Sequence, residues 1–350
     1  MKKVSVIGHF GFGHEYLDGQ TVKTKIVTEE LRRCYGENTI TVCDTHGGFK
    51  AVPKILWKII VLLKQHENII ILPAQNGLRV IATWLSVLNK FMCRKLHYVV
   101  IGGWLPEFVQ SRKSLMNILK KFEGIYVETE IMKQRLDAMG FTNIFVMPNC
   151  KKLKILQESE IKPIVDELHA VCTFSRVMRE KGIQEAVESV ALINKEFGRP
   201  LFILDIFGQV DVGQKAWFEE VKKKFSDCVH YKGVVPFDKS VETLRHYDVL
   251  LFPTYYDGEG FAGTVIDALA SGVPIIASDW RYNSELIKPY TNGLLVKCKD
   301  VDDLVSSLRY LHENIGAWNR MKVECLKESK YYLPENALKV LIDRIGNEEK

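Results

Sequence analysis

The chain has 350 residues, of which 47% are hydrophobic and 26% are charged, with a formal net charge of +5. This composition is normal for a soluble globular enzyme, and the length suffices for two domains of ordinary size. It excludes a membrane-spanning helix, because no run reaches the roughly 18 apolar residues that a span requires. The four residues between Lys3 and Gly8 are likewise too few for the apolar region of a signal peptide.

The cysteines show no spacing typical of metal ligands. No two form a Cys-x-x-Cys motif, and no combination of cysteine and histidine matches a zinc site. Most lie in apolar runs, at positions 34, 43, 93, 150, 172, 228, 298 and 325. They therefore predict buried thiols in a reducing cytoplasm and no bound metal.

The first half alternates short apolar runs with amphipathic segments, which predicts a parallel sheet flanked by helices. Strands are expected at residues 3–8, 39–43, 68–72, 96–101, 125–129 and 144–149. Helices are expected at residues 21–33, 49–65, 77–89 and 130–139. The last of these helices should be capped near Thr129.

The glycines after the first strand do not form a dinucleotide-binding motif. Gly8, Gly11 and Gly13 have the wrong order for Gly-x-Gly-x-x-Gly, and no helix is expected directly after them. Asp44 follows Gly8 by 36 residues, whereas a ribose-binding acid follows by about 20. A nicotinamide-dependent oxidoreductase is therefore disfavoured. The glycines fit either a tight turn or a loop that closes over a ligand.

The first half is also basic, because residues 1–165 carry a net charge of +10 against −5 for the remainder. Lys50, Lys54 and Lys58 recur every four residues and so share one face of the expected helix, near Trp57. The pattern fits a helix on an anionic membrane surface, and equally a crossover helix that exposes a lysine edge. A second basic segment contains Arg112, Lys113, Lys120 and Lys121.

The second half begins after a charged stretch, residues 150–167, which is the expected linker between domains. Strands are expected at residues 168–174, 201–207, 229–233, 248–253 and 273–277, followed by a hairpin at 292–296. A helix over 301–314 should be capped by Asp300, and a last helix is expected near 334–345.

A loop with three cations follows the first strand of this half. Arg176, Arg179 and Lys181 precede a helix that should begin at Ile183. Cations fixed in such a loop can bind an anion such as phosphate. Basic loops are also common on solvated surfaces, and the position of this loop upstream of residues 255–278 is what favours a functional role.

Residues 255–278 form the most informative stretch, a glycine-rich loop followed by a helix and a strand. The loop comes after a buried strand and so lies at the carboxyl edge of the sheet, where open α/β sheets bind ligands. Gly258, Gly260 and Gly263 allow a ligand to approach the backbone. The start of the helix offers unpaired N–H groups suited to phosphate.

Two acids, Glu259 and Asp267, lie eight residues apart in this stretch, one in the loop and one in the helix, which should end at Gly272. A carboxylate beside a phosphate would repel it, so these acids are better suited to accept hydrogen bonds from hydroxyl groups. A phosphate with hydroxyl-rich groups on either side is a nucleotide-sugar. One carboxylate would bind the ribose and the other the hexose.

The segment from Glu259 to Pro274 resembles the acid-x7-acid signature of retaining glycosyltransferases of the GT4 type. The family usually has glutamate at both ends, whereas Asp267 stands at the second position here. The loop 175–182 is similar to the family's Gly/Ser-Arg followed by Glu-Lys-Gly. Many members have a histidine near residues 102–104, and this chain has Gly-Gly-Trp there.

The resemblance is strongest over residues 168–315 and implies a GT-B fold, in which two Rossmann-like α/β domains with parallel sheets face a central cleft. It implies an acceptor-side domain over residues 1–160 and a nucleotide-sugar-binding domain over 161–330. The C-terminal helix in 331–350 is expected to cross back to the first domain.

The resemblance also implies roles for individual residues. Arg176 and Lys181 would hold the donor diphosphate, and Glu259 would contact the donor hexose; these three are expected to act in catalysis. Asp267 would bind the ribose. Further donor contacts are expected from residues of two loops, namely Gly19, Gln20, Gly260, Phe261, Ala262, Gly263 and Thr264.

The implied activity is transfer of a hexose-type sugar from a UDP- or GDP-sugar to a glycan or lipid-linked acceptor, with retention at the anomeric carbon. No metal or other cofactor and no nucleic acid is expected. The expected process is bacterial surface polysaccharide synthesis, in the cytoplasm and with attachment to the inner face of the plasma membrane as a further expectation. Two alternatives stay open: a nucleotide-sugar epimerase of the same fold, and a non-catalytic partner that binds a donor or glycan for another transferase.

Overall fold

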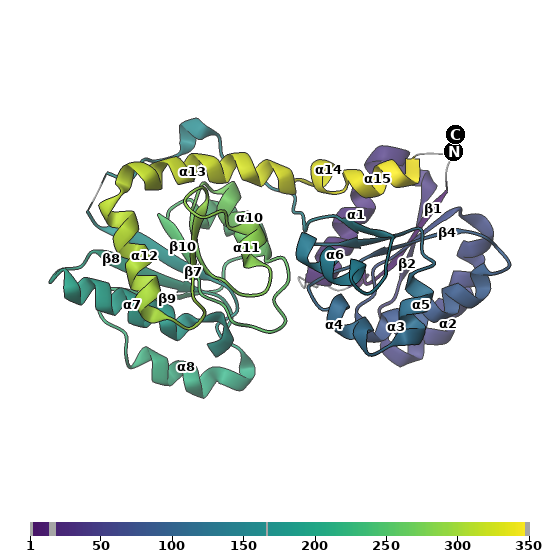
Figure 1. The fold of residues 1–350 in the computed structure, drawn as a ribbon, viewed down its shortest axis with the longest axis horizontal. Helices are drawn as coiled ribbons and strands as arrows, with labels where there is room; N and C mark the ends of the chain where they lie inside the picture. The colour runs from purple at the N-terminus through teal and green to yellow at the C-terminus, as the bar shows by residue number, and fades with distance from the viewer. Residues whose placement is uncertain (1–2, 14–18, 166, 347–350) are drawn as a thin grey trace. The chain divides into compact units, whose positions relative to one another are not determined.

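The computed structural model describes residues 3–13, 19–165 and 167–346, and the chain divides into two compact units. Unit 1 comprises Met1–Lys152 and Tyr332–Lys350, and unit 2 comprises Leu153–Tyr331. Each unit has a six-stranded parallel sheet with helices on both sides (Figure 1). The predicted α/β class with two parallel sheets is confirmed.

The sheet of unit 1 has the strand order β2-β1-β3-β4-β5-β6. Its strands are short and largely buried, which is why they read as nearly continuous apolar runs. They are β1 (Val4–Gly8), β2 (Ile40–Asp44), β3 (Asn68–Ile71), β4 (Lys95–Val99), β5 (Gly124–Val127) and β6 (Ile144–Val146). The direction in which strands are added reverses between β1 and β3.

The helices of unit 1 include two from the end of the chain. They are α1 (Gly19–Tyr35), α2 (Gly48–Gln65), α3 (Gln75–Asn89), α4 (Leu105–Gln110), α5 (Lys113–Leu119), α6 (Glu130–Asp137), α14 (Pro334–Ala337) and α15 (Lys339–Gly346). Leu338, Leu341 and Ile345 join the buried core of this unit. The Tyr35 hydroxyl donates a hydrogen bond to the Ile342 carbonyl at 2.7 Å, which ties α15 to α1.

The sheet of unit 2 has the order β12-β11-β10-β7-β8-β9, so its reversal lies between β7 and β10. Its strands are β7 (His169–Phe174), β8 (Phe202–Phe207), β9 (Val229–Gly233), β10 (Val249–Phe252), β11 (Ile275–Ser278) and β12 (Gly293–Val296). The hairpin expected at 292–296 is wrong. β12 pairs with β11 in parallel, because the chain crosses over through helix α11 before it returns to the sheet edge.

Two of the helices of unit 2 have a boundary at the residue that the sequence predicts. The helices of this unit are α7 (Ile183–Glu196), α8 (Lys215–Lys222), α9 (Ser240–Leu244), α10 (Gly263–Ala270), α11 (Asn283–Leu286), α12 (Val301–Glu313) and α13 (Ile315–Ser329). Asp300 caps α12 as predicted, because its carboxylate accepts the Asp303 N–H at 3.0 Å. Gly272 has a φ of 65° just past the end of α10, which confirms the predicted stop.

Two sequence-based expectations concern the chain as a whole. Within the described ranges, no helix combines the length and apolar character needed to span a bilayer.

All eight cysteines are free thiols, but only Cys43, Cys150, Cys172 and Cys325 are buried, whereas Cys34 and Cys93 are exposed. The expectation of buried thiols is therefore wrong for these two, because Cys34 lies in the last turn of α1 and Cys93 in the turn between α3 and β4.

Candidate active site

The predicted donor-site residues of unit 2 gather at the carboxyl edge of its sheet. The loop after β7 carries Arg176 and Lys181, and the loop after β10 carries Glu259. β7 and β10 are hydrogen-bonded neighbours on the two sides of the reversal in strand order. Open α/β sheets bind their ligands at such a switch point, so these two loops form the edge where a ligand is expected.

Two glycines allow the loops at this edge to pack closely. Gly182 has a φ of 69°, and a Cβ there would lie 2.2 Å from the carbonyl oxygen of Pro253. Gly208 has a φ of 134°, and a Cβ there would lie 1.7 Å from the carbonyl oxygen of Ser175. A larger residue at either position would push the basic loop away from the strand ends. The two glycines thus allow the loop that carries Arg176 and Lys181 to pack directly against the strand ends.

Lys181 and Glu259 form an ion pair at the switch point. The Lys181 ammonium lies 2.5 Å from Glu259 Oε2, and both side chains are largely buried. The Thr254 hydroxyl donates to the same carboxylate oxygen at 2.7 Å, and the Tyr256 ring lies 5.0 Å from the ammonium. A cation and a hydrogen-bond acceptor therefore occupy adjacent positions, although the two residues are separated by 78 positions in the chain.

Arg176 and Arg179 are held differently from Lys181. Arg176 is 62% exposed and lies 3.7 Å from the Asp211 carboxylate, and an exposed ion pair of this length restrains a side chain only weakly. Arg179 lies over the Trp217 ring at 5.6 Å. Lys181 is therefore a fixed charge, whereas Arg176 can reorient toward an anion.

The start of α10 is tied to the end of β7. The Thr264 hydroxyl donates to the Phe174 carbonyl at 2.9 Å, and the first N–H groups of a helix have no partner within the helix. Residues Gly260, Phe261 and Ala262 lead into this helix, and Gly263 is its first residue. Asp267 lies one turn further on, with only 3% of its surface exposed. The predicted donor residues of this stretch thus share one loop and one helix start.

A group that sequence reasoning missed lies beside the same loop. Lys299, which follows β12, lies 4.3 Å from the centroid of the Tyr255 ring. Burial, together with the nearby carboxylate of Glu185, raises the pKa of Tyr255 to about 12. Burial also raises the pKa of Glu185. No motif marks this group, because its members come from three separate segments.

Gly19 and Gln20 lie in unit 1, at the reversal between β1 and β3. They were expected in a loop before the helix, and this is wrong because α1 begins at Gly19. The Gln20 amide donates to the Leu72 carbonyl at 3.3 Å, which joins the start of α1 to the end of β3. The predicted donor residues therefore come from both units, with only Gly19 and Gln20 in unit 1.

Sequence reasoning also missed a polar cluster at the carboxyl edge of β1 and β2. His9 lies 2.8 Å from the Thr21 hydroxyl and 3.2 Å from His46 Nδ1. Asp44 accepts the backbone N–H groups of Phe10 and His46, each at 2.9 Å. Burial alone would raise the pKa of Asp44, but the backbone N–H groups outweigh burial and lower it. The Asp44 carboxylate thus stabilises the glycine loop that follows β1. The cluster also places His9 and His46 at this edge of the sheet.

The edge of unit 2 is suited to a ligand with both anionic and hydroxyl groups. Lys181 and Arg176 supply positive charge, the start of α10 supplies N–H donors, and Glu259 supplies an acceptor. Across the described ranges, no three His, Cys, Asp or Glu side chains are grouped so that they could hold a metal ion. The fold and this edge are together typical of α/β proteins that bind ligands at the switch point of a parallel sheet.

Residues 169–314 match the family model Glycosyl transferases group 1. Two solved structures cover nearly the whole chain. Anabaena Alr3699/HepE in complex with UDP has a TM-score of 0.75 and 14% identity, over 99% of this chain and 100% of that one. The lipopolysaccharide outer core galactosyltransferase WaaB has a TM-score of 0.71 and 15% identity, over 98% and 99%. At these identities the likeness shows the fold, and it confirms the predicted GT-B class.

Curated relatives are also glycosyltransferases. The N,N'-diacetylbacillosaminyl-diphospho-undecaprenol alpha-1,3-N-acetylgalactosaminyltransferase of Campylobacter jejuni is 31% identical over 202 residues, 58% of this chain and 44% of that protein. The GtfA subunit of the UDP-N-acetylglucosamine–peptide N-acetylglucosaminyltransferase of Streptococcus parasanguinis is 28% identical over 169 residues, 48% and 32%. The amylovoran biosynthesis glycosyltransferase AmsK of Erwinia amylovora is 24% identical over 218 residues, 58% and 53%. The chain thus spans between about a third and about half of the length of these three relatives.

Proposed function

We propose that the protein transfers a hexose-type sugar from a nucleotide-sugar to a glycan or lipid-linked acceptor, with retention at the anomeric carbon. The observation that carries this proposal is the Lys181–Glu259 pair at the switch point of unit 2. A nucleotide-sugar needs a cation for its diphosphate and an acceptor for its sugar hydroxyls side by side. Lys181 supplies the cation and Glu259 supplies the acceptor, and their charged groups lie 2.5 Å apart.

Each predicted donor residue then has a role. Lys181 and Arg176 bind the diphosphate and stabilise the negative charge that it gains as it leaves the sugar. Glu259 accepts hydrogen bonds from the hexose, and Asp267 from the ribose. Backbone groups of residues 260–264 bind the phosphates or the sugar, and Gly19 and Gln20 contribute from unit 1. Because these two cations serve the diphosphate, the proposed reaction needs no metal ion or other cofactor.

The names of similar proteins support the class of donor and acceptor. HepE has been solved with UDP and with UDP-glucose, and the streptococcal GtfA subunits belong to transferases that use UDP-N-acetylglucosamine. The Campylobacter relative acts on a diphospho-undecaprenol-linked sugar. We therefore favour a UDP-sugar donor over a GDP-sugar, and a lipid-linked acceptor in bacterial surface polysaccharide synthesis.

A panel of nucleotide-sugars tests this proposal. One UDP- or GDP-sugar should raise the thermal midpoint, because a ligand at about 100 times its Kd adds roughly 2.7 kcal/mol to the free energy of unfolding. With that donor, release of nucleoside diphosphate should depend on an acceptor and should persist in EDTA. Donor isomerisation without release would identify an epimerase instead. Binding without turnover by any acceptor would favour a non-catalytic partner, and rescue by magnesium after chelation would contradict the metal-free reaction.

We further propose that unit 1 attaches to the anionic cytoplasmic face of the plasma membrane through α2. Trp57 on this helix is 67% exposed and Lys54 is exposed, whereas Lys58 is half-buried. Lys50 lies in α2, but its side chain falls outside the described part of the structure. Exposed tryptophan and lysine on one helix are typical of attachment to an anionic interface.

Vesicle sedimentation tests this attachment. Binding should increase with the fraction of phosphatidylglycerol and decrease with salt, because each basic side chain near such a surface contributes about 1 kcal/mol. The double variant Lys54→Glu/Trp57→Ala should bind several-fold more weakly. Lys195→Glu, an exposed lysine of unit 2, is the matched control and should bind as the wild type does. Wild-type protein that ignores anionic vesicles at low salt would contradict attachment.

A further inference from the structure

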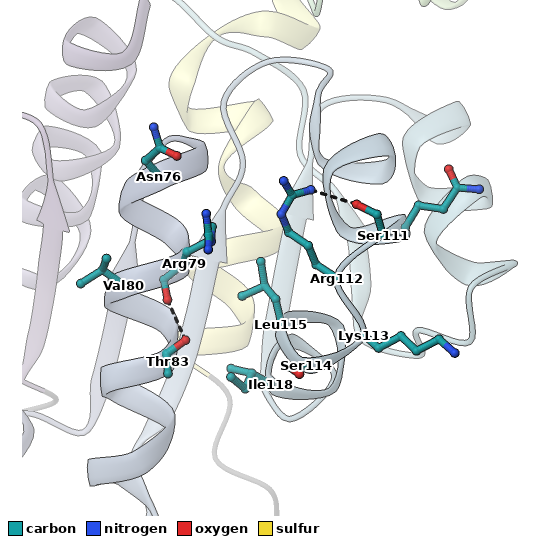
Figure 2. Close-up of a pocket in the computed structure, with 11 residues that line it drawn as sticks. Asn76, Arg79, Val80, Thr83, Ser111, Arg112, Lys113, Ser114, Leu115 and Ile118 are labelled. Atoms are coloured by element: carbon teal, nitrogen blue, oxygen red, sulfur yellow. Dashed lines mark hydrogen bonds between the residues drawn. The ribbon is translucent and has the colours of Figure 1, made fainter.

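A groove of about 1060 Å³ runs between α3 and α5 of unit 1, and its lining contains none of the residues assigned above to the donor (Figure 2). Its walls come from α3 on one side and from the loop and helix 110–118 on the other. Arg79 and Arg112 extend from opposite walls, whereas Lys113 points away from α3. The remaining lining includes small polar side chains such as Thr83, Ser111 and Ser114.

The groove is positively charged without compensation. Its lining contains Arg79, Arg112 and Lys113 but neither aspartate nor glutamate. Among the described residues, no carboxylate forms an ion pair with any of these three side chains. Uncompensated cations on facing walls are suited to a phosphate or diphosphate.

Arg112 is held in place for such a contact. Its guanidinium lies 4.0 Å from the centroid of the Phe108 ring, and its Nη1 donates to the Phe108 carbonyl at 2.7 Å and to Ser111 Oγ at 3.1 Å. Within the described ranges, both hydrogen bonds of this guanidinium use Nη1. The Nε and Nη2 groups stay available, and a side chain that is already ordered loses less entropy when it binds an anion.

An apolar cavity adjoins this groove. It has a volume of about 280 Å³, lies between α2 and α3, and shares Asn76 and Val80 with the basic groove. Its walls are mainly aliphatic, with Val52, Ile55, Leu56, Pro73, Ala74 and Ile81. It also reaches Gln20 and Thr45 at the carboxyl edge of the sheet. An anion site thus continues directly into an apolar one.

Three large apolar side chains beside these sites are exposed. Val80 and Val87 lie two turns apart on one face of α3 and are 46% and 50% exposed, and Phe91 beyond the end of α3 is 86% exposed. An apolar chain that leaves the cavity past Val80 would cover this face.

We propose that the groove and cavity bind a lipid phosphate: the phosphate or diphosphate lies between Arg79 and Arg112, and the hydrocarbon chain occupies the cavity and the face of α3. This inference rests on the proposed function and specifies its acceptor as a phosphate-bearing amphiphile. A phosphorylated glycan would use the cations but not the aliphatic walls, and a neutral glycolipid would use the walls but not the cations. Only an amphiphile with an anionic head uses both.

Calorimetric titration with farnesyl diphosphate tests the inference on the whole chain. Saturating UDP is present, so that the donor diphosphate site is occupied. Farnesyl diphosphate should bind at least about tenfold more tightly than inorganic diphosphate, because the latter lacks the apolar chain. Arg79→Gln/Arg112→Gln should weaken farnesyl diphosphate binding by about tenfold or more, and the uncharged Val80→Ser should weaken it without changing the affinity for inorganic diphosphate. Lys90→Gln, at an exposed position just past α3, is the matched control and should leave both affinities unchanged.

Several results would overturn the inference. They are equal affinity for farnesyl diphosphate and inorganic diphosphate, loss of farnesyl diphosphate binding when UDP is added, and wild-type affinity in the double arginine variant. UDP binding is measured on the same samples. A protein that binds UDP but not farnesyl diphosphate would refute the lipid phosphate site alone. A protein that binds farnesyl diphosphate but no nucleotide or nucleotide-sugar would refute the proposed function.

Discussion

Glu259→Gln and Lys181→Met are each expected to lower sugar transfer by roughly two orders of magnitude or more, because each removes a charged contact that strengthens as the diphosphate leaves. Each single substitution should also lower the thermal midpoint by a few degrees. The two side chains are largely buried against one another, and a buried charge without its partner is costly. Initial rates with a saturating donor and thermal midpoints measure the two effects separately.

The double variant Lys181→Met/Glu259→Gln separates function from structure. It leaves no unpaired charge, so its thermal midpoint should recover toward that of the wild type while sugar transfer stays low. Arg176→Ala is a useful comparison, because Arg176 is 62% exposed; it should weaken binding of nucleoside diphosphate without a change in midpoint. Recovery of both activity and midpoint in the double variant would show that the pair only supports the fold.

The sheets could be predicted from the sequence because buried parallel strands are nearly continuous apolar runs. β3, with the sequence Asn-Ile-Ile-Ile, and β10, with Val-Leu-Leu-Phe, are fully buried. The ends of helices were predicted where a side chain caps the helix, as Asp300 caps α12. The prediction began the first helix of unit 1 at Thr21 rather than at Gly19, because glycine disfavours a helical conformation.

The members of the candidate site could be predicted, but their contacts could not. A sequence places Lys181 after one strand and Glu259 after another, and both loops then lie at the same sheet edge. Direct contact depends on the reversal that makes β10 the neighbour of β7, and a resemblance implied only separate roles for the two residues. Lys299 beside Tyr255 and His9 beside His46 were missed for the same reason, because strand order alone brings their loops together.

The basic groove is a second feature whose residues could be seen in the sequence but whose arrangement could not be predicted from it. Arg112 and Lys113 stand out in the sequence as a basic segment, whereas Arg79 is a single cation on a helix surface and resembles many solvated arginines. Only the packing of α3 against α5 places Arg79 opposite Arg112 and leaves the groove between them. Charge in a sequence therefore indicates a cationic unit, and tertiary structure decides which cations act together.

Unit 1 contains a buried ion pair that no sequence pattern marks. The Lys23 ammonium on α1 lies 2.5 Å from Glu128 Oε1, and both side chains are 2% exposed. Lys23 also donates to the Val100 carbonyl at 3.3 Å, and Glu128 Oε2 accepts the Gly102 N–H at 3.1 Å. The pair thus joins α1 and the end of β5 to the glycine loop that follows β4.

Lys23→Met is expected to cost about 3–5 kcal/mol of unfolding free energy, because it leaves the Glu128 carboxylate buried without its cation. For a unit of this size the thermal midpoint should fall by roughly 10 °C. Lys23→Met/Glu128→Gln should regain most of this loss, since the amide can still accept the Gly102 N–H. Lys133→Met removes a surface pair with Asp137, 2.6 Å long and partly exposed on both sides, and should change the midpoint little. Equal midpoints for Lys23→Met and Lys133→Met in differential scanning calorimetry would contradict a stabilising role for the buried pair. A double variant no more stable than Lys23→Met would show instead that the lysine itself, through Val100, holds the end of β4.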